Sequence, residues 1–506
     1  MKSLEVTLVP ILSIIVIGVL LYIMLRENCW QKRYADLFAT VCVLQLCWFQ
    51  GYFFKIGQHE VSSLYGVAGY CLLIYSFYLL FSGRVYLKKN ILMTVIGFIT
   101  IIIFGMIYEK LLPYDGLLMP EQSSKISWDG YVAGKCLMYQ YVPSVSSFLR
   151  PLWEVFIFAF EVLIFKQIYS FEWFISPYMR IVGWLKYVIY YGYFEFIVKN
   201  VIGNLTFTFD FAAILLGVNE ESIYTDARIR DGIFYTLQGG TREPSHYNCV
   251  LFNIAMLMLL GNILRKFAQK RGWNVPQTYS NMTFLLCLVL MLLTGGFSSV
   301  WFLFIIACCT ILLRIRENGG SVFGFFLCRK LILLSFVGVC IIVSYVISQN
   351  DYLYNRLMDA LEVIEFLGKN NGFVGIGIIG GNSGIGSTIA RFVSIYEGWQ
   401  VFMARPLLGI SWHVQYIHDF SIFMLMNMGI LGVYALYRML SVSRENLRYD
   451  VLILGLIFMI GGLPVTVSTG GLCLHWLLFF EATTFYMNHW EEKDVSAKDI
   501  DYHSCV

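Results

Sequence analysis

The sequence contains little charge for its length. Of its 506 residues, 14% are charged and 58% are hydrophobic, and the mean hydropathy is +0.68. A soluble protein needs more charge on its surface, so this composition excludes one and indicates a chain that crosses a membrane many times. The formal net charge is only +3 and is spread along the chain, which excludes a nucleic-acid partner.

Cysteine patterns of a disulfide framework or a zinc site are also missing. Most of the 13 cysteines lie inside apolar runs, where a thiol behaves as a small hydrophobe. We therefore expect no bound metal and no cofactor. The chain has no fixed-period repeat, which transporters built from two halves often show. Its first apolar run lacks a small-residue cleavage site and leads into Arg26, so we expect it to be retained as a span.

Long apolar runs are abundant. Because each crossing of the bilayer needs roughly 20 mostly apolar residues, the sequence predicts an all-α polytopic membrane protein with about 13 transmembrane helices, within a range of about 12 to 14. The expected spans cover residues 6–25, 35–54, 64–82, 91–108, 152–169, 181–198, 247–264, 281–295, 298–313, 331–348, 419–440, 451–467 and 472–487.

Basic residues predict the orientation of these spans. Short loops rich in Lys and Arg stay in the cytoplasm, and such loops alternate with the predicted spans. The segment 201–218 is apolar but contains Asp210. We expect it to be re-entrant or interfacial, because a crossing there would place the basic loops that follow it on the extracytoplasmic side. The basic groups are Arg26, Lys32 and Arg33; Arg84, Lys88 and Lys89; Lys166 and Arg180; Arg265, Lys266, Lys270 and Arg271; Arg314, Arg316, Arg329 and Lys330; and Arg438, Arg444 and Arg448.

Three long stretches then fall outside the cytoplasm, where long loops tend to carry function. The predicted units follow chain order. They are N-terminal transmembrane helices (1–198) with an extracytoplasmic loop (109–151), an extracytoplasmic arginine loop (199–246), central transmembrane helices (247–348), a large extracytoplasmic loop (349–418), C-terminal transmembrane helices (419–487) and a cytoplasmic tail (488–506).

The arginine loop predicts a phosphate site. Arg228, Arg230 and Arg242 fall near one membrane face, and the planar guanidinium binds phosphate oxygens through two parallel hydrogen bonds. Such a group suits the diphosphate of a lipid carrier. The alternative is that these arginines contact anionic lipid headgroups, or pair with Asp231 and Glu243.

The large loop carries a second set of polar residues. Its glycine-rich run, 372–386, lacks the Lys-Ser/Thr ending of a nucleotide-binding loop, so we interpret it as a hinge or lid. Arg391 and Arg405 follow the run and suit a sugar attached to phosphate. His418, at the mouth of the next helix, can accept a proton from a hydroxyl, and Asp419 can orient the imidazole. A lone histidine there is more often an interfacial residue that only forms hydrogen bonds.

A motif runs through this region. Its residues, in chain order, are Arg391, the segment Pro406-Leu407-Leu408-Gly409, His418, nine residues that follow Asp419, and then Gly429 and Gly432. This pattern resembles the bacterial O-antigen polymerase (Wzy-type) and O-antigen ligase superfamily. The chain departs from the pattern at Asp419, where Asn, Ser or Gln is usual. Arg228, Gly239 and the segment Arg242-Glu243-Pro244 resemble the arginine-glycine motif of polymerase loops.

The resemblance implies a metal-independent membrane glycosyltransferase with a GT-C-like fold. Its donor would be an undecaprenyl-diphosphate-linked oligosaccharide, and its active site would lie on the periplasmic side of the bacterial inner membrane. A chain-length regulator protein would be a partner. The implied roles are catalysis by His418; substrate binding by Arg228, Arg242, Arg391, Arg405 and Glu243; and support by Asp419, Gly239, Gly409, Gly429 and Gly432.

Two alternatives to an O-antigen or capsular polysaccharide polymerase remain open. The first is the ligase of the same superfamily, which transfers glycan to lipid A core. The second is a polysaccharide flippase or another transporter. A transporter predicts charged residues within the bundle, which occur here as Glu154, Glu161, Lys186, Glu195 and Glu481.

Overall fold

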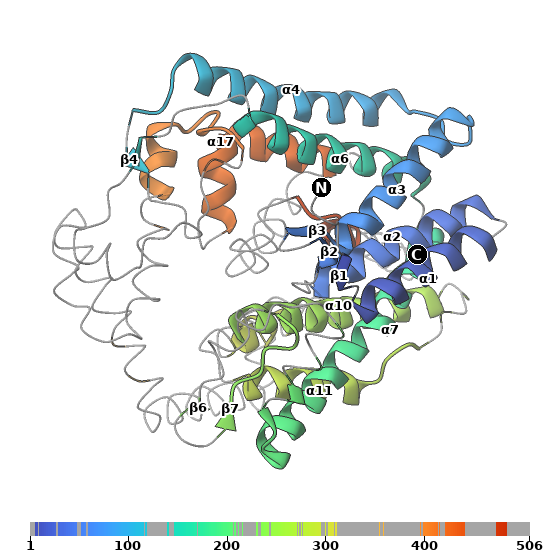
Figure 1. Cartoon of the computed structure of the whole chain (residues 1–506). Helices are drawn as coiled ribbons and strands as arrows, with labels where there is room; N and C mark the ends of the chain where they lie inside the picture. The colour runs from blue at the N-terminus through green and yellow to red at the C-terminus, as the bar shows by residue number, and fades with distance from the viewer. Residues whose placement is uncertain are drawn as a thin grey trace, which may run out of the picture.

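Helices make up most of the described structure (Figure 1). The computed structural model describes residues 6–8, 10–26, 29–47, 52–56, 59–115, 117–118, 139–140, 146–169, 171–205, 207–208, 211, 215, 229–230, 234–241, 244–270, 272, 275, 277–294, 299, 302–307, 309–310, 354, 358, 395, 398–412, 414, 420–440 and 472–482. The predicted spans 331–348 and 451–467 lie outside these residues.

The described helices overlap the predicted apolar runs, although α6 and α7 begin six and ten residues before the predicted spans 152–169 and 181–198. In chain order they are α1 (Ile11–Arg26), α2 (Trp30–Cys47), α3 (Leu64–Phe81), α4 (Lys89–Leu111), α6 (Ser146–Ile168), α7 (Phe171–Phe196), α10 (Pro244–Lys270), α11 (Asn281–Leu293) and α17 (Phe420–Leu440). The π-helix η1 (Ile197–Ile202) extends α7 and ends at Gly203, which has a φ of 74°. The predicted span 35–54 ends early, at Cys47, and a strand follows it.

Short strand pairs accompany the helices. A three-stranded antiparallel sheet joins β1 (Val6–Leu8), β2 (Tyr52–Ile56) and β3 (His59–Ser63). Two further pairs form between helices, namely β4 (Leu117–Leu118) with β5 (Tyr139–Gln140), and β6 (Ile229–Arg230) with β7 (Phe234–Tyr235). The last two pairs therefore lie within the predicted extracytoplasmic loops.

Local sequence explains where several helices begin. Ser63 caps α3, because its hydroxyl accepts a hydrogen bond from the amide of Gly66 at 3.2 Å. Ser280 and Thr283 form a capping box at the start of α11, in which each side chain bonds the backbone amide of the other residue. These caps satisfy amides that the first turn of a helix leaves without a carbonyl partner.

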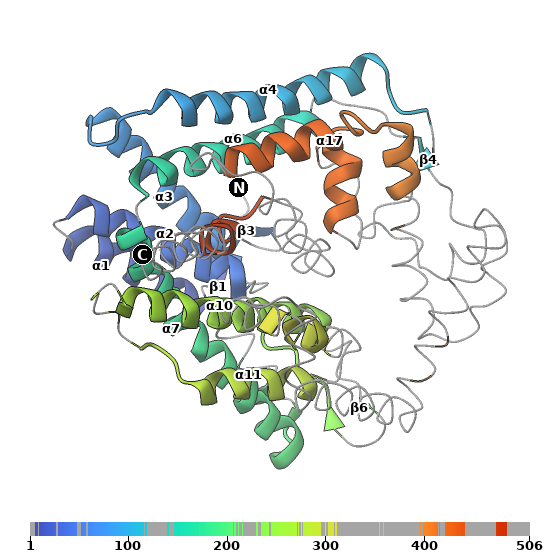
Figure 2. The same cartoon turned by 180° about the vertical axis from the view of Figure 1, so that it is seen from behind.

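The turns predicted to be cytoplasmic gather at one end of the helices. Figure 1 shows the connections from α1 to α2, α3 to α4, α6 to α7 and α10 to α11 on the right, whereas β4, β6 and β7 lie at the opposite end. The view from behind agrees (Figure 2). This arrangement matches the alternation of basic and long loops in the sequence, and we call the end with β4, β6 and β7 the loop end.

The helices form layers. The helix α4 packs on α6 and α17, α2 packs on α3 and α7, and α10 packs on α7 and α11 (Figures 1 and 2). The helix α10 is largely enclosed by its neighbours, since 83% of its span His246–Lys266 is buried. The functional residues described below lie on these layers near the loop end.

Four helices are long and apolar enough to cross a membrane, namely Leu64–Phe81, Lys89–Leu111, His246–Lys266 and Ser421–Leu440. The apolar helix α4 is only 33% buried within the protein, and its outward side chains include Ile96, Phe104 and Ile107. Exposing such an apolar face to water costs free energy, whereas contact with lipid does not. The described structure therefore indicates a helical membrane protein, and the count of about 13 spans stays a prediction.

Candidate functional site

The helix α17 is broken at Gly429. This residue has φ 63° and ψ −178°, which are not helical angles, and Figure 1 shows the two halves of α17 running in different directions. The sequence predicted one uninterrupted span over 419–440. A break of this kind leaves amides at the start of the second half, and carbonyls at the end of the first half, without partners in the helix.

The segment Pro406-Leu407-Leu408-Gly409, which we call the PLLG turn, supplies those partners. The amide of Ile430 donates to the carbonyl oxygen of Pro406 at 2.8 Å, and the amide of Leu431 donates to that of Leu407 at 3.1 Å. In return, the amide of Ile410 donates to the carbonyl oxygen of Met426 at 2.9 Å. The two parts of the sequence motif that flank His418 therefore form one hydrogen-bonded unit.

Glycine is required at both sides of this contact. Gly409 has a φ of 66° and Gly429 a φ of 63°, in the left-handed region that other residues rarely adopt. A Cβ atom on Gly429 would overlap the carbonyl group of Leu407, and one on Gly409 would overlap the carbonyl oxygen of Met426. The glycines of the motif thus let two backbones approach each other closely.

The same unit anchors the chain that leads to His418. Asn427 is fully buried, and its Oδ1 accepts a hydrogen bond from the amide of Val414 at 3.0 Å. Its Nδ2 donates to the carbonyl oxygen of Phe423 at 2.8 Å. Val414, the described residue that comes closest before position 418, is therefore bonded to the first half of α17. His418 itself lies outside the described residues, as do Asp419 and Arg391.

Arg405, at the start of the PLLG turn, contacts the end of α4. Its Nη2 donates to the carbonyl oxygens of Leu112 and Pro113 at 3.0 and 3.1 Å, and its guanidinium carbon lies 5.0 Å from the centre of the Tyr108 ring. Arg405 as a whole is half-buried. These contacts place the turn at the loop end of α4, and the role of Arg405 in substrate binding stays a prediction.

The second part of the predicted site is anchored by a buried carboxylate. Glu195, near the end of α7, accepts the amides of Gln238 at 3.0 Å on Oε1 and of Gly239 at 2.7 Å on Oε2. Lys199, one turn further along, pairs with Oε1 at 2.5 Å. The buried charge pair therefore clamps the turn that precedes Arg242 and Glu243, which lie outside the described residues together with Arg228.

The π-helix η1 presents further groups to the same loop. The side chain of Asn200 bonds both backbone groups of Tyr235, with distances of 2.5 Å from its Oδ1 to the amide and 3.3 Å from its Nδ2 to the carbonyl oxygen. Insertions that make π-helices are frequent at functional sites. No sequence pattern predicted η1 here, although Glu195, Lys199 and Asn200 are polar residues at the end of an apolar run, which is a usable signal.

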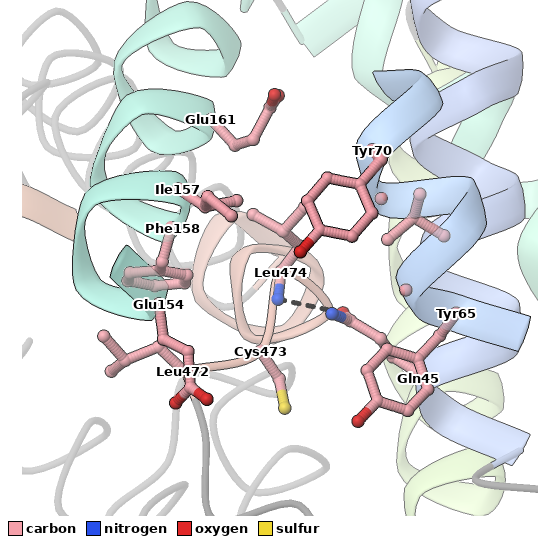
Figure 3. Close-up of a pocket in the computed structure, with 13 residues that line it drawn as sticks. Gln45, Tyr65, Tyr70, Glu154, Ile157, Phe158, Glu161, Leu472, Cys473 and Leu474 are labelled. Carbon is pink, nitrogen blue, oxygen red and sulfur yellow. Dashed lines mark hydrogen bonds between the residues drawn. The ribbon is translucent and has the colours of Figure 1, made fainter. Parts of the chain in front are cut away.

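A cavity of about 200 Å³ lies between α2, α3, α6 and the segment 472–474. Figure 3 shows Glu154 and Glu161 projecting from α6, and Tyr65 and Tyr70 on the facing helix α3. The sequence singled out both glutamates as charges within a span, but it gave no means of predicting that they share a cavity. No group of three or more metal-binding side chains occurs among the described residues.

The described geometry defines the class of protein as a helical membrane protein with a broken helix, α17, at its loop end. The sequence matches no known protein family and no curated protein. The function must therefore be argued from the residues of this chain.

Proposed function

We propose that the chain is a metal-independent membrane glycosyltransferase that polymerises an O-antigen or capsular polysaccharide. It would transfer a glycan from undecaprenyl diphosphate to the terminal sugar of another lipid-linked repeat unit. In this proposal about 13 helices cross the bacterial inner membrane in a GT-C-like arrangement, with the active site on the periplasmic side. The other proposed partner is a chain-length regulator protein.

The contact between the PLLG turn and the break in α17 is the observation that carries the proposal. The sequence motif consists of residue types at a fixed spacing. Its glycines have a structural role, because they allow the backbone of residues 406–409 to contact the backbone at Gly429. This contact bonds the backbone at 406–410 to the backbone at 426–431, and position 418 lies between these two segments in the sequence. A catalytic base needs a fixed position, because small displacements of a reacting group lower rates strongly.

The chemistry follows from the residue types. The diphosphate is a good leaving group whose negative charge needs stabilisation, which Arg228, Arg242 and Arg391 would supply without a metal. The acceptor hydroxyl needs a base, and neutral His418 would accept its proton as the new glycosidic bond forms. The bond between the anomeric carbon of the donor sugar and the diphosphate oxygen breaks in the same step, and the arginines would stabilise the negative charge left on undecaprenyl diphosphate.

Arg405 and Glu243 would complete the binding surface. Arg405 directly precedes the PLLG turn and contacts the residues that follow α4, and Glu243 follows the turn whose amides Glu195 accepts. Asp419, Gly239, Gly409, Gly429 and Gly432 would support the site. Gly409 and Gly429 approach backbone atoms closely, and the amide of Gly239 donates to the side chain of Glu195, which fits a supporting role.

The ligase and the transporter remain the other candidates. A ligase would share the motif, so only the acceptor separates it from a polymerase. The cavity beside Glu154 and Glu161 is the observation that favours a transporter, because buried charges within a bundle often mark a transport pathway.

Product analysis separates these functions. The purified protein is incubated with lipid-linked repeat units and a metal chelator, and the products are resolved by size. A polymerase yields a ladder of lengths, whereas a ligase yields a single addition to lipid A core when that acceptor is supplied. Movement of the substrate across vesicles, without any new bond, would identify a transporter and contradict the proposal.

A further inference from the structure

The end of α7 and the π-helix η1 bind a segment that follows Arg228 in the sequence. Three polar side chains on this stretch contact backbone groups of residues 235–239. They are Glu195, Lys199 and Asn200. A regular α-helix, with about 3.6 residues per turn, would place Asn200 roughly 140° around the axis from Glu195. The wider turn of η1 reduces this angle, so all three side chains reach the same loop.

Asn200 binds both backbone groups of Tyr235. Its Oδ1 accepts the amide at 2.5 Å, and its Nδ2 donates to the carbonyl oxygen at 3.3 Å. In an antiparallel strand, the two backbone groups of one residue point to the same side. The side chain of Asn200 therefore occupies the edge of β7 at which a third strand would pair, and it supplies the donor and the acceptor that such a strand would supply.

The opposite edge of β7 pairs with β6. Ile229 lies opposite Tyr235, and Arg230 lies opposite Phe234. Because Asn200 takes both backbone groups of Tyr235, only the second of these two pairs is left to exchange hydrogen bonds between the strands. A two-stranded ribbon this short is marginally stable at best without further contacts. The position of both strands therefore depends on what binds the outer edge of β7.

We call residues 229–235 the arginine hairpin, because Arg230 lies in β6 and Arg228 directly precedes that strand in the sequence. The buried charge pair of α7 and η1 binds residues that follow the hairpin, rather than the hairpin itself. Among the described side chains, Asn200 makes the hydrogen bonds that reach the hairpin. Its removal should free the hairpin and leave the next turn in place.

We propose that Asn200 is a positioning residue that fixes the arginine hairpin for binding a polyprenyl diphosphate. This inference rests on the proposed function, in which Arg228 binds the diphosphate, and Arg230 would add a second guanidinium from the same hairpin. Paired hydrogen bonds from a guanidinium to phosphate require a fixed orientation, so a hairpin that moves binds the diphosphate less tightly. An amide at position 200 is also neutral, whereas a carboxylate there would attract the arginines and compete with phosphate.

Binding of farnesyl diphosphate to the whole chain in phosphatidylcholine nanodiscs tests this role. Asn200→Ala removes both hydrogen bonds to Tyr235 and leaves the arginines in the sequence, and it should raise Kd about tenfold. Asn200→Asp keeps the shape and the acceptor but turns an oxygen toward the carbonyl of Tyr235, so it should also raise Kd. This second variant keeps the test decisive if Asn200→Ala fails to fold.

Asn204→Ala is the matched control. Asn204 lies four residues further along, and its Oδ1 accepts the amide of Phe207 at 3.1 Å. The control thus removes a hydrogen bond from side chain to backbone of the same kind. It should lower the temperature of unfolding by an amount comparable to Asn200→Ala, but its Kd should equal that of the wild type. A purely structural role of Asn200 would affect binding equally in the two variants.

Hydrogen exchange measures the hairpin itself, without any ligand. In Asn200→Ala, the amides of residues 229–235 should exchange at least about tenfold faster than in the wild type. Those of residues 236–241, two of which Glu195 binds, should not change.

Two results would overturn the positioning role alone. They are unchanged exchange in the arginine hairpin of Asn200→Ala, and a Kd within about twofold of the wild type in both Asn200 variants. A wild-type chain that binds no farnesyl diphosphate would overturn the diphosphate site of the proposed function together with this role.

Discussion

The amide of Ile430 donates to the carbonyl oxygen of Pro406 at 2.8 Å, across the break in α17. This bond and its neighbours replace the hydrogen bonds that an unbroken helix would make within itself. Because the segments 406–410 and 426–431, which precede and follow position 418 in the sequence, are bonded to each other, we expect a change at this contact to alter activity without replacing His418.

Gly429→Ala tests the contact. The new Cβ would overlap Leu407, and alanine disfavours a φ of 63°, so we expect a loss of about 1–3 kcal/mol in the free energy of unfolding. The measurements are thermal unfolding and turnover, and both should fall, turnover by about tenfold or more. Gly97→Ala, at a position with open space, should change neither quantity. Wild-type melting and turnover in Gly429→Ala would show that the close approach is not needed.

Glu195→Gln tests the clamp on the loop 236–241. The change leaves the buried Lys199 charge without its partner, and we expect it to lower the free energy of unfolding by about 3–5 kcal/mol. The double variant Glu195→Gln/Lys199→Met removes both charges and should be more stable than Glu195→Gln alone. Chemical denaturation of Glu195→Gln, Lys199→Met and the double variant measures the coupling energy between the two residues. Strict additivity would contradict a paired role for these residues.

Much of the fold was predictable because a membrane span has a simple signature. Apolar runs place α3, α4, α10 and α17 within a few residues of the observed helices. The end of α2 at Cys47 was missed, since the next residues are also apolar and aromatic, and hydropathy alone does not distinguish a helix from a strand.

The site was predictable only in part. The spacing of the motif identified Gly409 and Gly429. Their backbone angles and close contacts explain why few other residues could occupy these positions. The break in α17 was missed, because its amides are satisfied by the PLLG turn, a partner that lies elsewhere in the sequence. The sequence also marked Glu195 as a charge within a span but could not connect it to Gly239, whose amide it accepts.

Arg405 and Arg228 should respond differently to replacement by Lys. Arg405 donates to two backbone carbonyls and stacks on Tyr108, so Arg405→Lys should lower the free energy of unfolding by about 1 kcal/mol and also weaken substrate binding. Arg228→Lys should leave unfolding unchanged and lower turnover by about tenfold or more, because the bidentate phosphate contact is lost. Melting curves and turnover of both variants provide the test. Wild-type turnover in Arg228→Lys would remove this arginine from the diphosphate site.

Turnover of His418→Gln on lipid-linked repeat units, measured beside the wild type and His418→Ala, tests the central claim most directly. Glutamine can hydrogen-bond the acceptor hydroxyl but cannot take its proton, so both variants should lose about a hundredfold or more in kcat while lipid-linked substrate still binds. The wild type should form a ladder of products without added metal. Near-normal polymerisation by His418→Gln would contradict the assignment of His418 as the base.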